Sequence, residues 1–314
     1  MEYKWYKSGG DLLRQIRETD LPANELAFWY LGQMGILVKY REELVALDVL
    51  ISELRRADGS VGATNYRPPF GAGELTGVTA FLGSHDHADH INTQTLIPLQ
   101  KSNPGLKIII PESVRNTVLA RTFIRNGADE ESAETSGGVL PGSVPERLDP
   151  ANVIGAAAGQ EIEISPDIRV LPLASAHETY ETDEDGHDFS LGYAVKIGPF
   201  LLYHSGDTVL TERLIADVRS ACAWGGAAGP DAEFLPVNGA DLPRHRRNIV
   251  GNMDERSAAF LAKETGADLV VPLHYDLVPG NSADPLVFAS VMNEEYPGRR
   301  YGIYRLGERV VLVK

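Results

Sequence analysis

The residues best suited to chemistry lie in one short segment, SHDHADH, over residues 84–90. Three of the eight histidines of the chain, His85, His87 and His90, fall in it together with two aspartates. Imidazole and carboxylate groups at this density suit Zn²⁺, Mn²⁺ or Fe²⁺, and a single short loop lowers the entropy of assembling them. His85 and His87 alternate and project the same way on an extended chain, whereas Asp89 and His90 follow a bend. The segment can therefore offer two imidazoles to one metal ion, and a carboxylate plus an imidazole to a second.

Three apolar, strand-like runs later in the chain each end on a group that could complete such a site. The run VLPLASAHE ends on His177, FLLYHSGDT on Asp207, and DLVVPLHYD on His274. The carboxyl ends of strands in α/β proteins meet loops, and active sites are usually built there. A polar turn would explain a single histidine, and one such coincidence would be weak. Three coincidences in addition to the short histidine-rich segment favour a metal site.

The elements that must position these groups read as strands separated by helices. Apolar runs over residues 26–32, 35–40 and 43–51 predict the first strands, and Gly32 and Gly35 predict a turn between the first two. We predict helices over residues 11–18, 112–126 and 254–265. Runs of strands with helices between them indicate an α/β fold, with two sheets and the helices outside.

Three further segments predict irregular structure or chain ends. Residues 58–77 are rich in Gly and Pro, which is typical of a long loop that can act as a lid. Residues 128–160 are acidic and then rich in Gly and Ala, which predicts a surface excursion. Residues 301–314 predict a hairpin-like pair of strands that closes the chain.

The charge and composition of the chain limit its partners. Lys and Arg total 29 against 44 Asp and Glu, and the net charge of −15 argues against nucleic acid as a partner. No apolar run approaches the ~18 residues of a membrane-spanning helix, and the first residues lack a signal-peptide pattern. Cys222 is the single cysteine, which excludes an internal disulfide and suits a reducing compartment. We therefore expect a cytoplasmic protein that does not bind membranes.

Four motifs, SHDHADH, SAHE, HSGDT and PLHYD, resemble those of the metallo-β-lactamase fold superfamily in type and order, over nearly the whole chain. Within that superfamily the sequence is most similar to the L-ascorbate 6-phosphate lactonase group, on FWYLGQMGILVKY, LYHSGD, RNIVGNMD and VVPLHYD. The resemblance implies an α/β fold of the αββα type, a four-layer sandwich of two mixed sheets flanked by helices. It also implies one hydrolase domain over residues 1–314.

The resemblance further implies two divalent metal ions, Zn²⁺ or Mn²⁺, with Fe²⁺ as a further candidate. His85, His87 and His177 would bind the first ion, Asp89, His90 and His274 the second, and Asp207 would bridge them. Two cations roughly 3.5–4 Å apart can share a water and lower its pKa towards neutrality, so that a bridging hydroxide becomes the nucleophile. Asp89 has a second oxygen to hold that nucleophile and to pass a proton to the leaving group.

Several other residues are candidates for the site. His204 lies three residues before Asp207 and could donate a proton or contact substrate, with a hydrogen-bonded core histidine as an equal alternative. Asp48 ends a strand and could orient a ligand imidazole, or could be solvated. Tyr275 follows a predicted ligand and could point its hydroxyl at the substrate, although packing is the commoner use of tyrosine.

Two loops are the candidates for substrate recognition. ATNYRPPF contains Arg67, and LPRHRRNIVGNM contains Arg247 and Asn252. Arginine can bind a phosphate or carboxylate through two hydrogen bonds, and a solvated surface charge is the alternative. We choose Arg247 as the residue that would hold an anionic group of the substrate.

The function predicted from these observations is a metal-dependent hydrolase of a small ester, most concretely a lactonase acting on a sugar lactone that could be phosphorylated. The alternative is a phosphodiesterase acting on a small cyclic phosphodiester, because the same metal pair serves phosphoryl transfer. Redox members of the superfamily carry a glutamate where this chain has His87, and a binding protein without activity would be expected to have lost a ligand. We expect a small-molecule substrate and a homo-oligomeric assembly.

Overall fold

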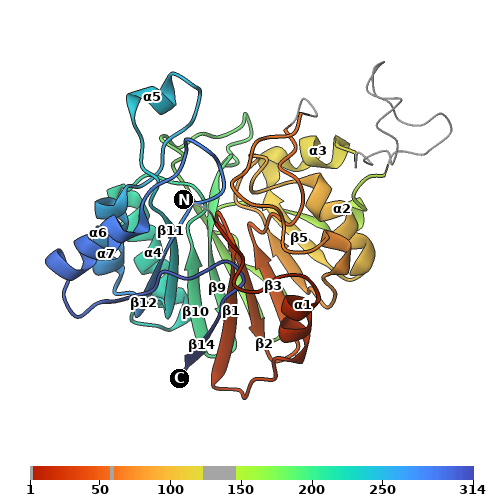
Figure 1. Cartoon of the computed structure of the whole chain (residues 1–314), viewed down its shortest axis with the longest axis horizontal. Helices are drawn as coiled ribbons and strands as arrows, with labels where there is room; N and C mark the ends of the chain where they lie inside the picture. Colours follow the sequence, from red (N-terminus) through yellow and green to blue (C-terminus); the bar gives the residue numbers. More distant parts are fainter. Residues whose placement is uncertain (1–2, 57–59, 123–145) are drawn as a thin grey trace.

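Two seven-stranded β-sheets organise the protein in the computed structural model, which describes residues 3–56, 60–122 and 146–314 (Figure 1). The first sheet has the order β14 (Arg309–Val313), β1 (Glu25–Gly32), β2 (Gly35–Tyr40), β3 (Glu43–Leu47), β4 (Ala80–Leu82), β5 (Lys107–Pro111) and β6 (Val153–Ala156). The second has the order β13 (Arg300–Tyr301), β12 (Leu269–Leu273), β11 (Ala232–Pro236), β10 (Phe200–His204), β9 (Leu191–Ile197), β8 (Ile168–Ala174) and β7 (Ile162–Ser165). Both sheets are mixed, because antiparallel pairings on one side give way to parallel pairings on the other.

Helices cover the outer face of each sheet. Against the first sheet lie α1 (Gly9–Glu18), α2 (Thr93–Ser102) and α3 (Glu112–Ala120). Against the second lie α4 (Glu212–Gly225), α6 (Glu255–Thr265) and α7 (Pro285–Glu295). Shorter helical turns are η1 (Ala72–Glu74), η2 (Pro150–Asn152) and α5 (Leu242–His245), and α5 projects from one end of the molecule (Figure 1). This is the αββα arrangement of two mixed sheets that the sequence predicted.

Strand β1 shows why the strands read as continuous apolar runs. Phe28 and Tyr30 point between the sheets, and the Phe28 ring packs edge-on against Phe234 of the second sheet at 5.2 Å. Ala27 and Trp29, on the alternate face, pack under the helices of the first sheet. Both faces are buried, so no polar alternation is left to read. Burying one large apolar side chain of this kind contributes roughly 1.5–3 kcal/mol.

The structure changes two of the sequence predictions about chain ends and loops. The predicted hairpin over 301–314 is wrong, because β13 pairs parallel with β12 in one sheet and β14 pairs antiparallel with β1 in the other. The predicted surface excursion over 128–160 is wrong at its end, because Val153–Ala156 forms β6, paired parallel with β5. The helix predicted to reach residue 126 ends earlier, because α3 stops at Ala120 and Arg121 has an extended backbone. Most of the remainder of the predicted excursion lies outside the described residues.

Candidate metal centre

Seven His and Asp side chains gather in two neighbouring groups. The first group is His85, His87, His177 and Asp207, and the second is Asp89, His90 and His274. Within each group, one ligand atom per residue lies within 4.8 Å of all the others. The structure thus brings together all the residues predicted as metal ligands and divides them as the resemblance implied, with Asp207 in position to serve both groups.

Each donor is positioned by the end of a β-strand. Residues 85–90 follow β4 directly, and the loop closes on itself where the His90 amide donates to the His87 carbonyl at 3.0 Å. His177 follows β8, Asp207 follows β10, and His274 follows β12. Parallel strands end at one edge of a sheet, so loops after different strands deliver their side chains to a common place.

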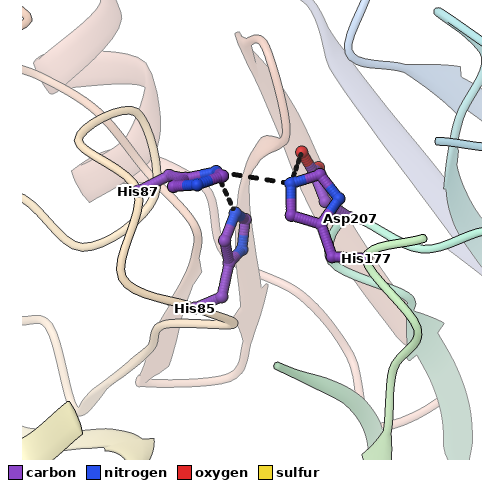
Figure 2. A group of neighbouring side chains, drawn as sticks. All are labelled: His85, His87, His177 and Asp207. Atoms are coloured by element: carbon purple, nitrogen blue, oxygen red, sulfur yellow. Dashed lines mark hydrogen bonds and ion pairs between the residues drawn. The ribbon is translucent and has the colours of Figure 1, made fainter. Parts of the chain in front are cut away.

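The first group converges on a small volume (Figure 2). The Nδ1 atom of His87 lies 2.8 Å from His85 Nε2 and 3.3 Å from His177 Nε2. His177 Nε2 is also 3.7 Å from Asp207 Oδ2. A neutral imidazole carries one N–H, so three rings and a carboxylate facing each other cannot all pair by hydrogen bonds. A single cation held by these four side chains would satisfy all of them at once.

The second group shares Asp207 with the first. Asp207 Oδ2 lies 3.0 Å from His274 Nε2, and its Oδ1 lies 3.5 Å from His90 Nε2. Asp89 Oδ2 is 3.6 Å from both His90 Nε2 and His274 Nε2. His90 Nε2 and Asp207 Oδ1 are buried and have no hydrogen-bond partner among the described residues. Such an atom costs roughly 1–3 kcal/mol, and a bound cation removes that cost, so the residues fit a pair of metal ions.

At His85, His177 and Asp207 the electrostatics favour the protonation states that metal ligands need, whereas Asp207 and Asp89, against the effect of burial, raise the pKa of His90 and of His274. Burial, reinforced by His90 and His87, holds the pKa of His85 well below its ordinary value, and burial lowers the pKa of His177 to about 4. Burial by itself would raise the pKa of Asp207, but His274 and His90 hold that pKa well below its ordinary value. Two imidazoles are therefore neutral and the shared aspartate is charged, which is the form in which each binds a cation.

A second layer of hydrogen bonds holds the imidazoles in place. Asp48 Oδ2 lies 2.8 Å from His90 Nδ1, and its Oδ1 accepts from the Ser84 amide at 2.7 Å. The Ser84 hydroxyl donates to Asp48 Oδ2 at 2.5 Å and lies 2.9 Å from His85 Nδ1. Asp48 is 1% exposed and has a φ of 46°. It is therefore buried against the ligand imidazole of His90, the first of the two positions that the sequence allowed for it. Partners of this kind fix the tautomer and angle of a ligand imidazole.

Gln33 belongs to the site and was missed by the sequence analysis. Its side-chain amide donates to Asp89 Oδ2 at 2.8 Å and lies 3.0 Å from His274 Nε2. The backbone carbonyl of Gln33 accepts a hydrogen bond from the backbone amide of His274 at 2.9 Å. The residue is 1% exposed with a φ of 55°, in the tight turn between β1 and β2. The available signal was a large polar residue between two glycines, GQMG, in an otherwise apolar hairpin.

Asp276 anchors Gln33 from behind. Its carboxylate accepts hydrogen bonds from the backbone amide of Gln33 at 2.9 Å and from the hydroxyls of Tyr30 and Tyr66 at 2.6 and 2.8 Å. Tyr66 belongs to the Gly- and Pro-rich loop, so that loop is tied to the back of the metal centre. Burial raises the pKa of Asp276, and the three donors oppose that rise.

Replacing Gln33 by leucine is expected to weaken metal binding at the Asp89 and His274 group. The change removes the donor that orients both side chains, and losing such a partner typically costs roughly ten- to a hundredfold in metal affinity. A chelator-competition titration measures this, with Gln160→Leu, at an exposed site, as the matched control. Equal affinities in the two variants would contradict the role assigned to Gln33.

Two residues predicted to act at the site, His204 and Tyr275, make other contacts in the structure. The ring of His204 is 1% exposed, with Nε2 lying 2.8 Å from the Met34 carbonyl and Nδ1 accepting from the Gly206 amide at 3.2 Å. Both nitrogens are used by the backbone, so His204 is a hydrogen-bonded core histidine and not a proton donor. Tyr275 is 5% exposed and packs in the central core, its ring 6.1 Å from that of Tyr30. Tyr275 therefore has the packing role, which is the commoner use of tyrosine.

The residues predicted to bind substrate make hydrogen bonds of their own or are exposed in the structure. Arg247 donates to the carbonyls of Gly280 at 2.8 Å and Pro243 at 3.3 Å, so its guanidinium joins two loops. Asn252 is buried and its amide donates to Asn238 Oδ1 at 3.1 Å. Arg67 is exposed on the loop before η1. Two of the N–H groups of Arg247 therefore have backbone acceptors, and its anion-holding role stays a prediction.

Comparison with known proteins supports the class that this fold and site define, a metallo-β-lactamase-type α/β protein. Residues 27–275 match the family described as "Beta-lactamase superfamily domain". A protein named UPF0173 metal-dependent hydrolase, from Caldivirga maquilingensis, is 24% identical over 245 residues, which cover 78% of this chain and 85% of that protein. The chain belongs to the metallo-β-lactamase superfamily.

Solved structures agree on the fold. Igni18, a metallo hydrolase from the hyperthermophilic archaeon Ignicoccus hospitalis, has 18% sequence identity and a TM-score of 0.60, covering 92% of this chain and 98% of that one. An isothiocyanate hydrolase from Delia radicum gut bacteria has 13% identity and a TM-score of 0.62, covering 91% of this chain and 99% of that one. At such identities the likeness concerns the arrangement of strands and helices.

Proposed function

We propose that the protein is a metal-dependent hydrolase that uses two metal ions to open a small ester, most concretely a sugar lactone. One observation carries the proposal: two donor groups share Asp207, and two buried atoms facing them, His90 Nε2 and Asp207 Oδ1, lack any other partner among the described residues. Membership of the superfamily and the printed name of the archaeal relative, a metal-dependent hydrolase, support the same reading. The motifs shared with the L-ascorbate 6-phosphate lactonase group support the lactone.

His85, His87 and His177 would hold one ion, Asp89, His90 and His274 the other, and Asp207 both. A metal pair held there supplies Lewis acidity, which activates water near neutral pH and polarises a carbonyl or phosphoryl oxygen. Zn²⁺ and Mn²⁺ suit this mixture of imidazole and carboxylate donors, as does Fe²⁺.

The chain's own part in the reaction falls to Asp89. Its Oδ2 faces His90 and His274 and accepts from Gln33. We assign its other oxygen, Oδ1, to hold the attacking water and to carry the water's proton to the leaving group. Gln33 fixes the carboxylate so that this oxygen keeps its direction, and Asp48 does the same for His90.

We also propose a small-molecule substrate, a cytoplasmic location and a homo-oligomeric assembly. The charge of −15 and the single buried cysteine, Cys222, support the first two. Within the described ranges, every helix is too short or too polar to cross a bilayer. Apolar side chains on two outer elements support the third: Leu286 and Val287 on α7 are 66% and 47% exposed, and Val313 on β14 is 64% exposed.

Metal analysis followed by a substrate screen tests the proposal. Gently purified protein should carry close to two equivalents of Zn, Mn or Fe, and should hydrolyse lactones faster than small cyclic phosphodiesters. A value near zero after incubation with these metals would overturn the dinuclear reading. Faster turnover of the phosphodiesters would favour the alternative, a phosphodiesterase with the same metal centre.

A further inference from the structure

The backbone of Gly251 contacts the donor ring of His177 at the nitrogen that does not face the other donors. His177 Nδ1 lies 3.2 Å from the Gly251 carbonyl oxygen. Its Nε2 faces His87 Nδ1 at 3.3 Å and Asp207 Oδ2 at 3.7 Å (Figure 2). A carbonyl oxygen accepts and never donates, so the contact with Gly251 is a hydrogen bond only when the proton is on Nδ1.

The two nitrogens of His177 compete for one proton, because a neutral imidazole carries a single N–H. With the proton on Nε2, the ring is drawn to donate to Asp207 or His87, and that nitrogen has no lone pair for a cation. With the proton on Nδ1, the Gly251 carbonyl accepts it and Nε2 is free to bind. The position of Gly251 therefore decides whether His177 is ready to act as a ligand.

Glu178, the residue after His177, holds the other backbone group of the same glycine. Glu178 Oε1 accepts a hydrogen bond from the Gly251 amide at 2.8 Å. On an extended chain two adjacent side chains point to opposite faces and would not reach one residue. At Glu178, however, φ is 68°, and His177 and Thr179 pair across it as an isolated antiparallel bridge. This turn brings the His177 and Glu178 side chains to one glycine.

The close approach requires glycine at position 251. A Cβ there would lie 2.3 Å from the Ala240 Cβ and 2.8 Å from Glu178 Oε1, so a larger residue would push the backbone away from both partners. Glu178 Oε1 also lies 3.1 Å from His245 Nε2 on α5, but the His245 side chain is 44% exposed. Such a solvated pair contributes little, and the hold on Glu178 comes chiefly from Gly251, which is buried.

We propose that Glu178 is a positioning residue. By holding Gly251 it keeps the proton of His177 on Nδ1 and leaves Nε2 free towards His87 and Asp207. The use of that nitrogen by a metal ion rests on the proposed function, whereas the tautomer of the ring does not.

NMR of the metal-free protein, labelled with ¹⁵N in its histidine rings, tests the tautomer, because the two ring nitrogens have different shifts in each form. His177→Gln identifies the His177 signals by their loss. Near neutral pH the parent should show the Nδ1–H form, and Glu178→Ala should move both shifts towards the average of the two forms. Glu178→Gln, whose amide oxygen still accepts from Gly251, should match the parent. An Nε2–H ring in the parent, or an unchanged ring in Glu178→Ala, would overturn the role.

Zinc affinity, measured by chelator competition, gives a second readout that does not depend on turnover. Glu178→Ala should weaken zinc binding about tenfold, at the low end for partners that orient a ligand, because it acts through Gly251. Glu178→Gln should stay within about twofold of the parent. Glu184→Ala, at an exposed position of the same loop, is the matched control and should bind like the parent. Alanine keeps a Cβ at the left-handed position, so the backbone cost there is unchanged, and circular dichroism checks the fold.

The two measurements separate this role from the proposed function. Equal weakening by Glu178→Ala and Glu178→Gln would assign the effect to the charge and would overturn the role of the Gly251 contact. Parent-like zinc affinity in a Glu178→Ala protein whose tautomer has shifted would overturn it as well. If the parent binds no zinc, manganese or iron, the proposed function fails, while the ring shifts still decide whether Glu178 fixes His177.

Discussion

Replacing Asp207 by asparagine is expected to remove both metal ions and to lower hydrolysis by orders of magnitude. Its Oδ2 lies 3.0 Å from His274 Nε2 and 3.7 Å from His177 Nε2, and its Oδ1 lies 3.5 Å from His90 Nε2. One carboxylate thus serves both groups, and a neutral amide bridges two cations poorly because it lacks the charge and one of the acceptor oxygens. Metal content by elemental analysis and kcat on a lactone measure the effect.

The matched control is Asp183→Asn, in the exposed loop where Asp183, Asp185 and His187 form a third cluster. That cluster needs no metal, because Asp183 already accepts from the amides of Asp185 and His187 at 3.0 and 2.8 Å. The control should keep about two equivalents and the parent activity. An Asp207→Asn protein that is folded by circular dichroism, yet retains parent metal content, would contradict the bridging role.

The free energy of unfolding is expected to fall as the pH rises from about 4.5 to about 7, because of Glu233 on β11. This side chain is 0% exposed, and neither carboxylate oxygen has a hydrogen-bond partner among the described residues. Burial raises the pKa of Glu233 from 4.5 to about 7, with opposing effects from Thr265 and Arg299. The Tyr203 hydroxyl, from the register position beside it on β10, is likewise buried and unpaired.

The sign follows from which state binds the proton. Between the two pKa values the folded protein keeps the Glu233 proton and the unfolded chain has lost it, so raising the pH favours unfolding. The contribution is complete below about 4.5 and falls by roughly 1.4 kcal/mol per pH unit, reaching a loss of about 3 kcal/mol above pH 7. Urea unfolding at pH 5 and pH 8 measures it.

Glu233→Gln should remove this part of the pH dependence, since the amide is neutral throughout. Glu163→Gln, at an exposed position on β7, is the matched control and should follow the parent. Other groups titrate in the same range, so the quantity to compare is the pH 5 to pH 8 difference in each variant. Parallel curves for Glu233→Gln and the parent would show that Glu233 is not neutral in the folded state.

Sequence patterns were misleading where pairing depends on distant strands. Residues 301–314 look like a hairpin because two apolar runs flank a turn, yet β13 extends the parallel end of one sheet and β14 the antiparallel end of the other. Residues 153–156 look like a loop because the stretch that contains them is rich in Gly and Ala. They nevertheless form a strand, only four residues long, whose hydrogen-bonding partner is β5. Which edge is free to accept a strand is a property of the assembled sheet.

The sequence by itself determined the class of fold and the group of candidate metal donors. Seven His and Asp residues stand either in one hexapeptide or just after an apolar strand, and both signals are local. Strands with helices between them indicated the layered α/β fold for the same reason, because hydrophobic patterns follow the period of each element.

Only the tertiary structure decided which other polar groups reach the donors and which do not. Gln33 joins the site because a buried carboxylate, Asp276, reaches across from the second sheet to hold its turn. His204 does not belong to the site, because both of its ring nitrogens are hydrogen-bonded to backbone groups. Arg56 lines a cavity together with Arg121, which is 65 positions later in the chain. These outcomes depend on contacts between residues remote in sequence, and no local period or spacing encodes such a contact.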